Sequence, residues 1–270
     1  MIFTAPVAPL MKTPDLTGEV ADEALYGMAA SVVGEEKGMY RVRMRYRYEG
    51  YVVPESAMRL PSADAWEAKA SFRVIAPTAD IMAKPAYQGH ILATLPRGAA
   101  LVVGQPALDE NGAETDWLGA SLADGTSGYV RRPSVRPARK WTPEAEDEMR
   151  GNVAADARRY LGTQYRWGGK SHFGIDCSGL AAMSYMLNGL YIYRDARIVE
   201  GYAVREIPAE RARPADLLFW PGHVAVYLGD GLYIHSTGKS SGVVINSLRS
   251  EHPDYRRDLA SVEKWGSVFE

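Results

Sequence analysis

The first half of the chain is a succession of short apolar runs separated by glycine and proline, and this pattern limits the fold more than any other feature. Such runs occupy residues 71–75, 91–95, 100–103, 117–120 and 128–130. Each is too short for a helix, and many short strands with this punctuation are typical of a small all-β barrel. We therefore expect one such domain over residues 67–138.

The segment before it, residues 1–66, repeats the pattern. Charged and apolar side chains alternate over residues 41–48, which is the signature of a half-buried strand, and Gly50 turns the chain before the next apolar run. Both segments carry Gly-Tyr-Val near their end, at Gly50 and at Gly128. We expect a first small barrel here, with an N-terminal extension. A chain of 270 residues has room for two or three domains.

The character of the sequence changes after residues 136–146, which predict a linker. The basic stretch of residues 131–140 is interpreted as solvated chain rather than as a binding patch. Thr142 and Pro143 predict a helix start. A second helix is expected after Cys177, followed by strands at 216–220, 223–228, 232–236 and 243–246. Helices followed by consecutive strands imply an α+β domain with an antiparallel sheet over residues 139–270.

Cys177 is the only cysteine of the chain. It follows a glycine-rich loop and precedes Leu180, Ser184 and Leu187, which recur at helical spacing. This places the thiol at a helix N-terminus, where unpaired N–H groups and the helix dipole favour a thiolate and could hold an oxyanion. Most lone cysteines are small buried apolar side chains, so the surroundings must decide between the two roles.

Two histidines lie on a predicted hairpin. His223 opens one strand, His235 lies in the next, and Gly229-Asp230-Gly231 separates them. A three-residue turn would place both on one face within roughly 5–8 Å, whereas a two-residue turn would place them on opposite faces. On one face, one histidine can take the proton of Cys177 while the other orients it. A zinc site of these three residues is the weaker alternative, because no CxxC or HExxH spacing is present.

Four motifs resemble the NlpC-type family of papain-like cell-wall cysteine peptidases over roughly residues 145–270. They are Trp167-Gly168-Gly169, the segment 176–180 around the cysteine, the segment 223–229, and Tyr233-Ile234-His235. The two small domains ahead of them resemble bacterial SH3-like modules. This combination is similar to the subgroup that cuts γ-D-glutamyl–L-diamino acid bonds in murein peptides. The resemblance implies a papain-like catalytic domain and no cofactor.

The resemblance also assigns roles to single residues. Cys177 would be the nucleophile, His223 the general base and later the general acid, and His235 the residue that orients His223. Ala196 stands where the family motif Arg-Asp-Ser has its serine, which puts the fine specificity in doubt. The substrate-binding set that the family implies in this domain comprises Tyr165, beside the oxyanion, and Asp176, Ser178 and Asp195.

In the subgroup, the first SH3-like module binds the free amine of an N-terminal L-alanine. A carboxylate and a tyrosine suit an ammonium group, and Glu19 and Tyr51 are the residues that we predict for this task. The competing interpretation is an exposed acid and a half-buried barrel aromatic. A need for a free amine would favour released peptides over intact wall, and hence peptidoglycan recycling.

The net charge and the N-terminal sequence limit which partners and which location we expect. The net charge is −2, which gives no reason to expect nucleic acid or an anionic membrane as a partner. The N-terminus lacks a basic region and prolines interrupt its apolar run, so we expect a cytoplasmic protein unless a leader has been removed. We also expect a monomer, with murein peptides as its substrate. Three alternatives stay open: a secreted wall lysin anchored by the SH3-like modules, a non-catalytic murein-peptide binding protein, and an amidase or acyltransferase of the same fold.

Overall fold

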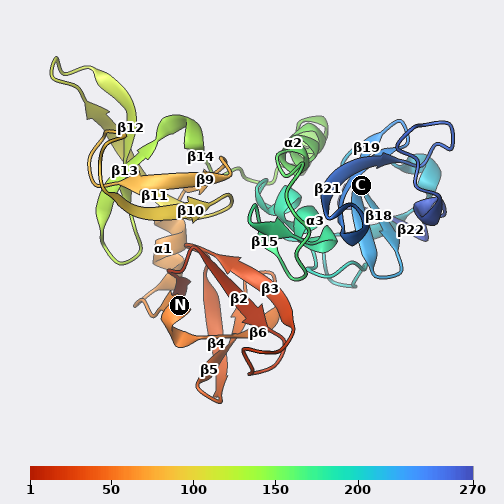
Figure 1. The fold of residues 1–270 in the computed structure, drawn as a ribbon, viewed down its shortest axis with the longest axis horizontal. Coiled ribbons are helices and arrows are strands. Elements are labelled where there is room, and N and C mark those ends of the chain that lie inside the picture. Colours follow the sequence, from red (N-terminus) through yellow and green to blue (C-terminus); the bar gives the residue numbers. More distant parts are fainter. Residues whose placement is uncertain (270) are drawn as a thin grey trace. The chain divides into compact units, whose positions relative to one another are not determined.

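The structure is a computed structural model that describes residues 1–269. Glu270, the last residue of the predicted catalytic domain, lies outside the described residues. The chain divides into two compact units, one of residues 1–138 and one that begins at Arg139 (Figure 1). Each unit is described by itself.

The first unit opens with a five-stranded antiparallel sheet in the order β3-β2-β6-β5-β4. The predicted alternation is present in β5, where Val42 and Met44 are buried and Arg41 and Arg43 are exposed. The strand ends at Met44 rather than at residue 48, because the chain turns there with Arg47 at a φ of 62°. The strands are β2 (Val7–Met11), β3 (Val20–Leu25), β4 (Ala30–Glu36), β5 (Met39–Met44) and β6 (Glu49–Val52), beside a small pair of β1 (Ile2–Phe3) and β7 (Ala57–Met58).

A seven-stranded antiparallel sheet follows, in the order β10-β9-β13-β12-β11-β8-β14. The start of the predicted linker belongs to it, because Arg136 and Pro137 lie in its last strand and pair with Arg73 and Phe72. The linker therefore begins after Pro137 and not at residue 136. The strands are β8 (Phe72–Val74), β9 (Thr78–Met82), β10 (Ile91–Pro96), β11 (Ala100–Leu108), β12 (Glu114–Ser121), β13 (Ser127–Arg131) and β14 (Val135–Pro137).

A few residues outside the five-stranded sheet pack into the hydrophobic core of the seven-stranded sheet. Helix α1 (Ala63–Lys69), which the sequence analysis did not predict, lies between them in the chain, and Trp66 donates its indole N–H to the carbonyl of Gly27 at 3.0 Å. Ile2 and Tyr26 from the first segment pack in the same cluster as Leu101 and Val130 from the second. The first segment thus contacts the core of the second sheet through Ile2 and Tyr26, and the assignment of residues 1–66 and 67–138 to SH3-like modules stays a prediction.

The second unit has the α+β arrangement expected from the sequence. Its antiparallel sheet has six strands in the order β17-β22-β18-β19-β20-β21, and α2 (Glu146–Arg158) and α3 (Cys177–Met186) pack against β19 (Figure 1). The strands are β17 (Arg205–Ile207), β18 (Leu217–Trp220), β19 (His223–Gly229), β20 (Leu232–Thr237), β21 (Gly242–Ser247) and β22 (Lys264–Ser267), with a small pair of β15 (Lys170–Ser171) and β16 (Gly174–Ile175).

Helix α2 begins later than the sequence predicts. A 3-10 turn at Pro143–Ala145 precedes it, and the side chain of Thr142 makes no capping hydrogen bond. Three acidic residues fill its first turn instead, where they interact favourably with the positive end of the helix dipole. The helix start is therefore stabilised by charge rather than by a hydroxyl cap.

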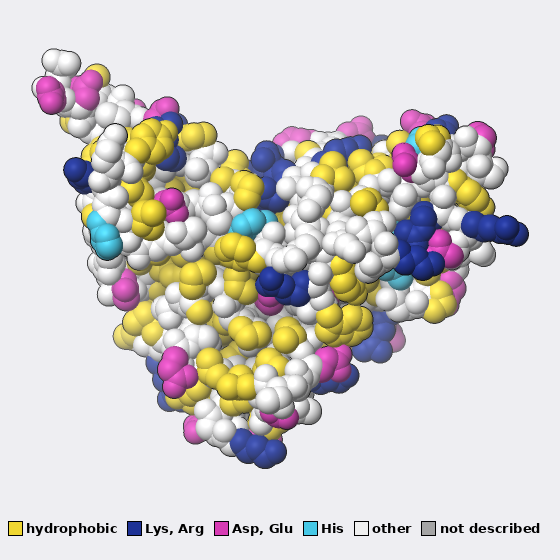
Figure 2. Space-filling view, in the orientation of Figure 1, with side chains coloured by type: hydrophobic (Ala, Val, Ile, Leu, Met, Phe, Trp, Pro, Cys, Tyr) yellow, Lys and Arg dark blue, Asp and Glu magenta, His cyan; other side chains and the backbone are white. Residues whose placement is uncertain are grey.

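The surface of the molecule mixes both signs of charge. On the face drawn in Figure 2, basic and acidic side chains are interspersed among apolar and neutral ones. Within residues 1–269 no helix is both long enough and apolar enough to span a membrane.

Candidate active site

Cys177 is the first residue of α3, and the loops around it hold the helix N-terminus in place. Asp176 is the N-cap: its carboxylate accepts hydrogen bonds from the N–H groups of Gly179 at 2.6 Å and Gly168 at 2.8 Å. A Cβ at Gly179 would lie 2.1 Å from the carbonyl oxygen of Gly169, so only glycine admits the loop this close. The glycine-rich motif therefore fixes Cys177, the predicted nucleophile, at the start of the helix.

A buried arginine completes this arrangement. The guanidinium of Arg194 is 1% exposed and donates to both carboxylate oxygens of Asp176, each at 3.1 Å. It also donates to Ser178 Oγ at 2.7 Å. Such a bidentate pair is among the stronger polar interactions in proteins. Arg194 stands at the arginine position of the family motif whose serine is replaced by Ala196, and its contacts hold Asp176 and Ser178 in position.

The hairpin of β19 and β20 brings the two histidines to the same face. Its turn and its strand register differ from those that the sequence predicted. The connection is a two-residue turn of Asp230 and Gly231, both with positive φ, as a type I′ turn requires. A two-residue turn alone would separate the histidines. However, a β-bulge between Tyr227 and Gly229 adds one residue and shifts the register, so that Tyr227 pairs with Tyr233. His223 and His235 are consequently diagonal neighbours.

Three side chains form a hydrogen-bonded chain on this face. His223 Nε2 lies 2.7 Å from His235 Nδ1, and the two rings meet edge to face with centroids 5.0 Å apart. His235 Nε2 lies 2.9 Å from Asn246 Oδ1. Asn246 was not predicted, although strand periodicity places it on the same face as Val244, which pairs with His235. Among residues 1–269, no group of three or more His, Cys, Asp or Glu side chains is placed to hold a metal ion.

The thiol of Cys177 lies at the beginning of β19. The backbone N–H of Val224, the residue after His223, forms a hydrogen bond to Cys177 that favours the thiolate. Helix α3 packs on β19 and β20, and Ser236 Oγ donates to the carbonyl of Ile175 at 2.7 Å. The loop that carries Cys177 and the histidine hairpin are thus joined to each other.

Burial dominates the protonation of the resting site. It raises the pKa of Cys177 to about 11, with Asp176 adding to the rise, although the N–H groups of Val224 and Ser178 and the charge of Arg194 act the other way. Burial also lowers the pKa of His223 and of His235 to about 4. The helix N-terminus was expected to lower the thiol pKa, and burial reverses that. Before substrate enters, the neutral thiol and neutral imidazole are favoured.

Tyr165 supplies a hydroxyl beside the thiol. Burial raises the pKa of Tyr165 to about 12, and the negative forms of Cys177 and Asp176 add to the rise. The phenol therefore stays protonated at neutral pH and can donate a hydrogen bond to developing negative charge. This position is compatible with the oxyanion role predicted for it.

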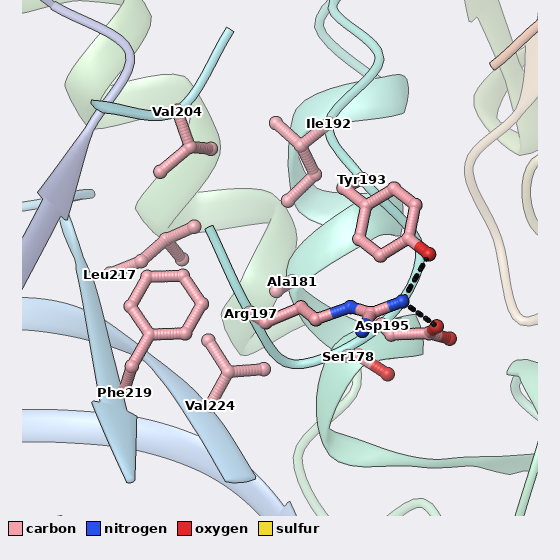
Figure 3. Close-up of a pocket in the computed structure, with 10 residues that line it drawn as sticks. All are labelled: Ser178, Ala181, Ile192, Tyr193, Asp195, Arg197, Val204, Leu217, Phe219 and Val224. Carbon is pink, nitrogen blue, oxygen red and sulfur yellow. Dashed lines mark hydrogen bonds and ion pairs between the residues drawn. The ribbon is translucent and has the colours of Figure 1, made fainter. Parts of the chain in front are cut away.

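A small pocket of about 10 Å³, room for roughly one water molecule, lies beside Ser178 and Val224. Its polar end carries Ser178, Tyr193, Asp195 and Arg197, and Arg197 donates to Tyr193 Oη at 2.8 Å (Figure 3). The remaining wall is apolar and consists of Ala181, Ile192, Val204, Leu217, Phe219 and Val224. The predicted pocket residue Asp195 therefore lines this cavity, which combines an apolar wall with charged groups at one end.

The residues predicted to bind the amine lie in the first unit. Glu19 forms an exposed ion pair with Lys12 at 2.8 Å, and Tyr51 donates its hydroxyl to Glu36 at 3.1 Å. Both belong to the first sheet or its loops. Their amine-binding role stays a prediction.

Comparison with known proteins identifies the chain. Residues 162–261 match the model of the NlpC/P60 family. The dipeptidyl-peptidase 6 of Lysinibacillus sphaericus is 41% identical over 271 residues, which cover 99% of both chains. This chain belongs to the NlpC/P60 family of peptidases. The matched range contains Cys177, His223 and His235.

Other members of the family show more distant similarity. A γ-D-glutamyl-L-lysine dipeptidyl-peptidase of Bacillus subtilis is 32% identical over 146 residues, which cover 50% of this chain and 46% of that protein. The crystal structure of an NlpC/P60 family protein from Bacillus cereus superposes with a TM-score of 0.74 at 19% identity, over 100% of this chain and 99% of that one. This match supports the fold, a papain-like catalytic unit with preceding β-structure.

Proposed function

We propose that this peptidase is a cysteine endopeptidase that hydrolyses the γ-D-glutamyl–L-diamino acid bond of murein peptides with a free N-terminal L-alanine. The observation that carries the proposal is the constellation of Cys177 at the start of α3 and the hydrogen-bonded pair of His223 and His235 at the start of the neighbouring hairpin. A nucleophile, a base and a residue that orients the base are the parts that acyl transfer needs.

The proposed reaction has two steps. Sγ of Cys177 attacks the γ-carbonyl carbon while its proton passes to Nδ1 of His223, the ring nitrogen that is not bonded to His235. The tetrahedral intermediate collapses to a thioester as His223 protonates the leaving amine. Water then attacks the thioester, gives its proton to His223, and releases the acid and the thiol.

The pocket beside the nucleophile supports the proposed acyl group. A γ-D-glutamyl residue presents two methylene groups and an α-carboxylate. The apolar wall around Phe219 and Val224 can contact the methylene groups, and Arg197, which lies 3.8 Å from Asp195, would exchange this ion pair for the substrate carboxylate. An ordinary α-linked peptide would present a side chain there instead of the carboxylate.

The names of the relatives support a requirement for a free amine. A dipeptidyl-peptidase removes two residues from a free N-terminus, and two relatives carry that name. We propose Glu19 and Tyr51 as the amine ligands and released wall peptides in the cytoplasm as the substrates. This would make the enzyme a participant in peptidoglycan recycling.

The test compares two substrates. L-Ala-γ-D-Glu-diaminopimelate and the same peptide with its alanine amine blocked by a muramyl group are incubated with the wild type and with Cys177→Ala. Cleavage of only the free peptide at the γ-bond, lost in the variant, is the expected result. The same pair with lysine in place of diaminopimelate shows which diamino acid is accepted.

Other outcomes have distinct meanings. Cleavage of both peptides would contradict the amine requirement and favour a wall lysin. Cleavage of neither by a folded protein would contradict the proposed bond and shift weight to an amidase, an acyltransferase or a binding protein. Glu19→Gln and Tyr51→Phe should each raise KM for the free peptide only, and an unchanged KM would remove these residues from the proposal.

A further inference from the structure

We infer that Asn246 is a positioning residue that fixes the proton arrangement of both active-site histidines. It touches neither the thiol nor the pocket, and it acts through His235. The kinetic part of this inference rests on the proposed function, whereas its spectroscopic part needs no substrate.

The orientation of the Asn246 amide follows from its two neighbours. Its Nδ2 lies 3.0 Å from the carbonyl oxygen of Asp254, which can only accept a hydrogen bond. The same carbonyl accepts the backbone N–H of Ser247 at 3.0 Å, so it is held in place. A reversed amide would set two acceptors against each other. Oδ1 of Asn246 therefore faces His235.

This orientation determines the tautomer of each ring in turn. Because Oδ1 of Asn246 accepts, His235 must carry its hydrogen on Nε2, and its Nδ1 is left as an acceptor. His223 must then carry its hydrogen on Nε2 in order to donate to His235 Nδ1. Nδ1 of His223 is left with a free lone pair. A neutral His223 is thus held in the form that can accept the proton of Cys177.

Without Asn246 the opposite arrangement becomes available. His235 could place its hydrogen on Nδ1 and donate to His223 Nε2, which would move the hydrogen of His223 to Nδ1. His223 would then have no lone pair for the thiol. Loss of an orienting hydrogen bond behind a catalytic or metal-bound histidine typically costs about 10- to 100-fold.

The charged and titratable groups around His235 come from two parts of the unit. His223 and Tyr233 lie on the same sheet, with the Tyr233 ring centroid 5.1 Å from that of His235. Arg256 and Asp258 act on it from the segment that follows β21, with opposite signs. A carboxylate at position 246 would add a negative charge in direct contact and would favour protonated His235.

The test uses Asn246→Leu and Asn246→Asp. Asn246→Leu removes the acceptor at similar size, so kcat should fall about 10- to 100-fold at all pH values, with KM changed less than about twofold. Asn246→Asp keeps an acceptor for His235 but turns its second oxygen toward the Asp254 carbonyl, so activity at high pH should exceed that of Asn246→Leu, while the acid limb of the profile moves up by about one pH unit. Asn111→Leu, on an exposed loop of the first unit, is the matched control.

Nitrogen NMR of histidine-labelled protein gives a readout that folding alone would not change. The wild type should show both rings protonated on Nε2, and Asn246→Leu should show protonated Nδ1. Protonated Nδ1 on His235 of the folded wild type would overturn the inference without any variant. The inference would also be overturned if Asn246→Leu and Asn246→Asp lost activity equally at every pH while the tautomers of both histidines stayed as in the wild type. If neither murein peptide is cleaved, the NMR result still decides, so the two proposals fail separately.

Discussion

At the scale of single residues, the candidate active site combines a partly buried histidine, His223, with a buried one, His235, in a hydrogen-bonded chain. Burial lowers the pKa of His223 and His235 to about 4, whereas an unfolded histidine titrates near 6.5. Between these values the unfolded chain binds more protons than the folded one. The pair therefore does not reduce the free energy of unfolding above pH 6.5, and reduces it progressively as the pH falls from 6.5 to about 4.

We accordingly expect the free energy of unfolding to decrease from pH 6.5 to pH 4, by on the order of 1.4 kcal/mol per pH unit for each histidine that stays neutral. Denaturant unfolding across this range measures the slope, and the double variant His223→Gln, His235→Gln should flatten it. Asp258, whose pKa the neighbouring Arg256 and Lys239 hold well below its usual range, affects stability only at lower pH. An equal slope in the double variant would refute the expectation.

Arg197 is the residue from which we expect a specificity effect. It is the cation of the pocket beside Ser178 and lies over the ring of Tyr193. Arg197→Met keeps much of the length and removes the charge, so KM for the γ-glutamyl peptide should rise about tenfold or more, with kcat changed little. Steady-state kinetics measures both constants. Arg213→Met, at an exposed ion pair with Asp147, should change neither, and an unaltered KM in Arg197→Met would rule out the carboxylate contact.

At the scale of secondary-structure elements, the hairpin of β19 and β20 shows what the sequence could and could not predict. Both strands and the turn were predicted from apolar runs and Gly229-Asp230-Gly231. The bulge before Gly229 was not, because an extra residue in a strand leaves no periodic signal in so short a run. Arg194 and Asn246 were missed for a related reason: their partners are distant in sequence and are set by the fold.

The bulge itself makes a prediction. Deletion of Leu228 would remove the extra residue while the turn of Asp230 and Gly231 stays the same. The register would shift by one, and His223 would move to the face opposite His235. We expect kcat/KM to fall by about 10³-fold or more in a folded protein.

Leu228→Ala is the matched control for this deletion, because it removes the same side chain but keeps the residue count. Its activity should stay within about threefold of wild type. Circular dichroism and thermal unfolding establish that both proteins are folded. A deletion variant with normal activity would show that the bulge does not set the position of His223.

At the scale of the whole molecule, the sequence predicted secondary-structure elements more completely than contacts. Motifs with fixed spacing indicated Cys177, His223 and His235, and the structure brings the two histidines together. Residues 1–138 were predicted as two small barrels from Gly/Pro punctuation, which indicates strands but not which segments pack together. Contacts such as the hydrogen bond from the Ala100 N–H to the Tyr26 carbonyl join segments that are far apart in the sequence.

Gly27 lies at this junction and gives the last prediction. It has a φ of 78°, and a Cβ there would lie 2.5 Å from the carbonyl oxygen of Ala100, whose N–H bonds to the carbonyl of Tyr26. Gly38 has a φ of 76° with nothing within 4 Å of its would-be Cβ. Gly38→Ala should therefore cost only about 1–2 kcal/mol of backbone strain. Gly27→Ala should cost clearly more, because Ala100 must also move.

Scanning calorimetry of the full chain measures both variants. Because the chain forms two compact units, we expect Gly27→Ala to lower the unfolding temperature of the transition that belongs to residues 1–138 by more than Gly38→Ala does. The backbone amide NMR signals of Val224 and His235, which lie in the second unit, should be the same in both variants as in the wild type at temperatures below that transition. Equal decreases of the unfolding temperature in the two variants would mean that only the positive φ disfavours alanine at position 27. They would contradict the predicted extra cost of moving Ala100.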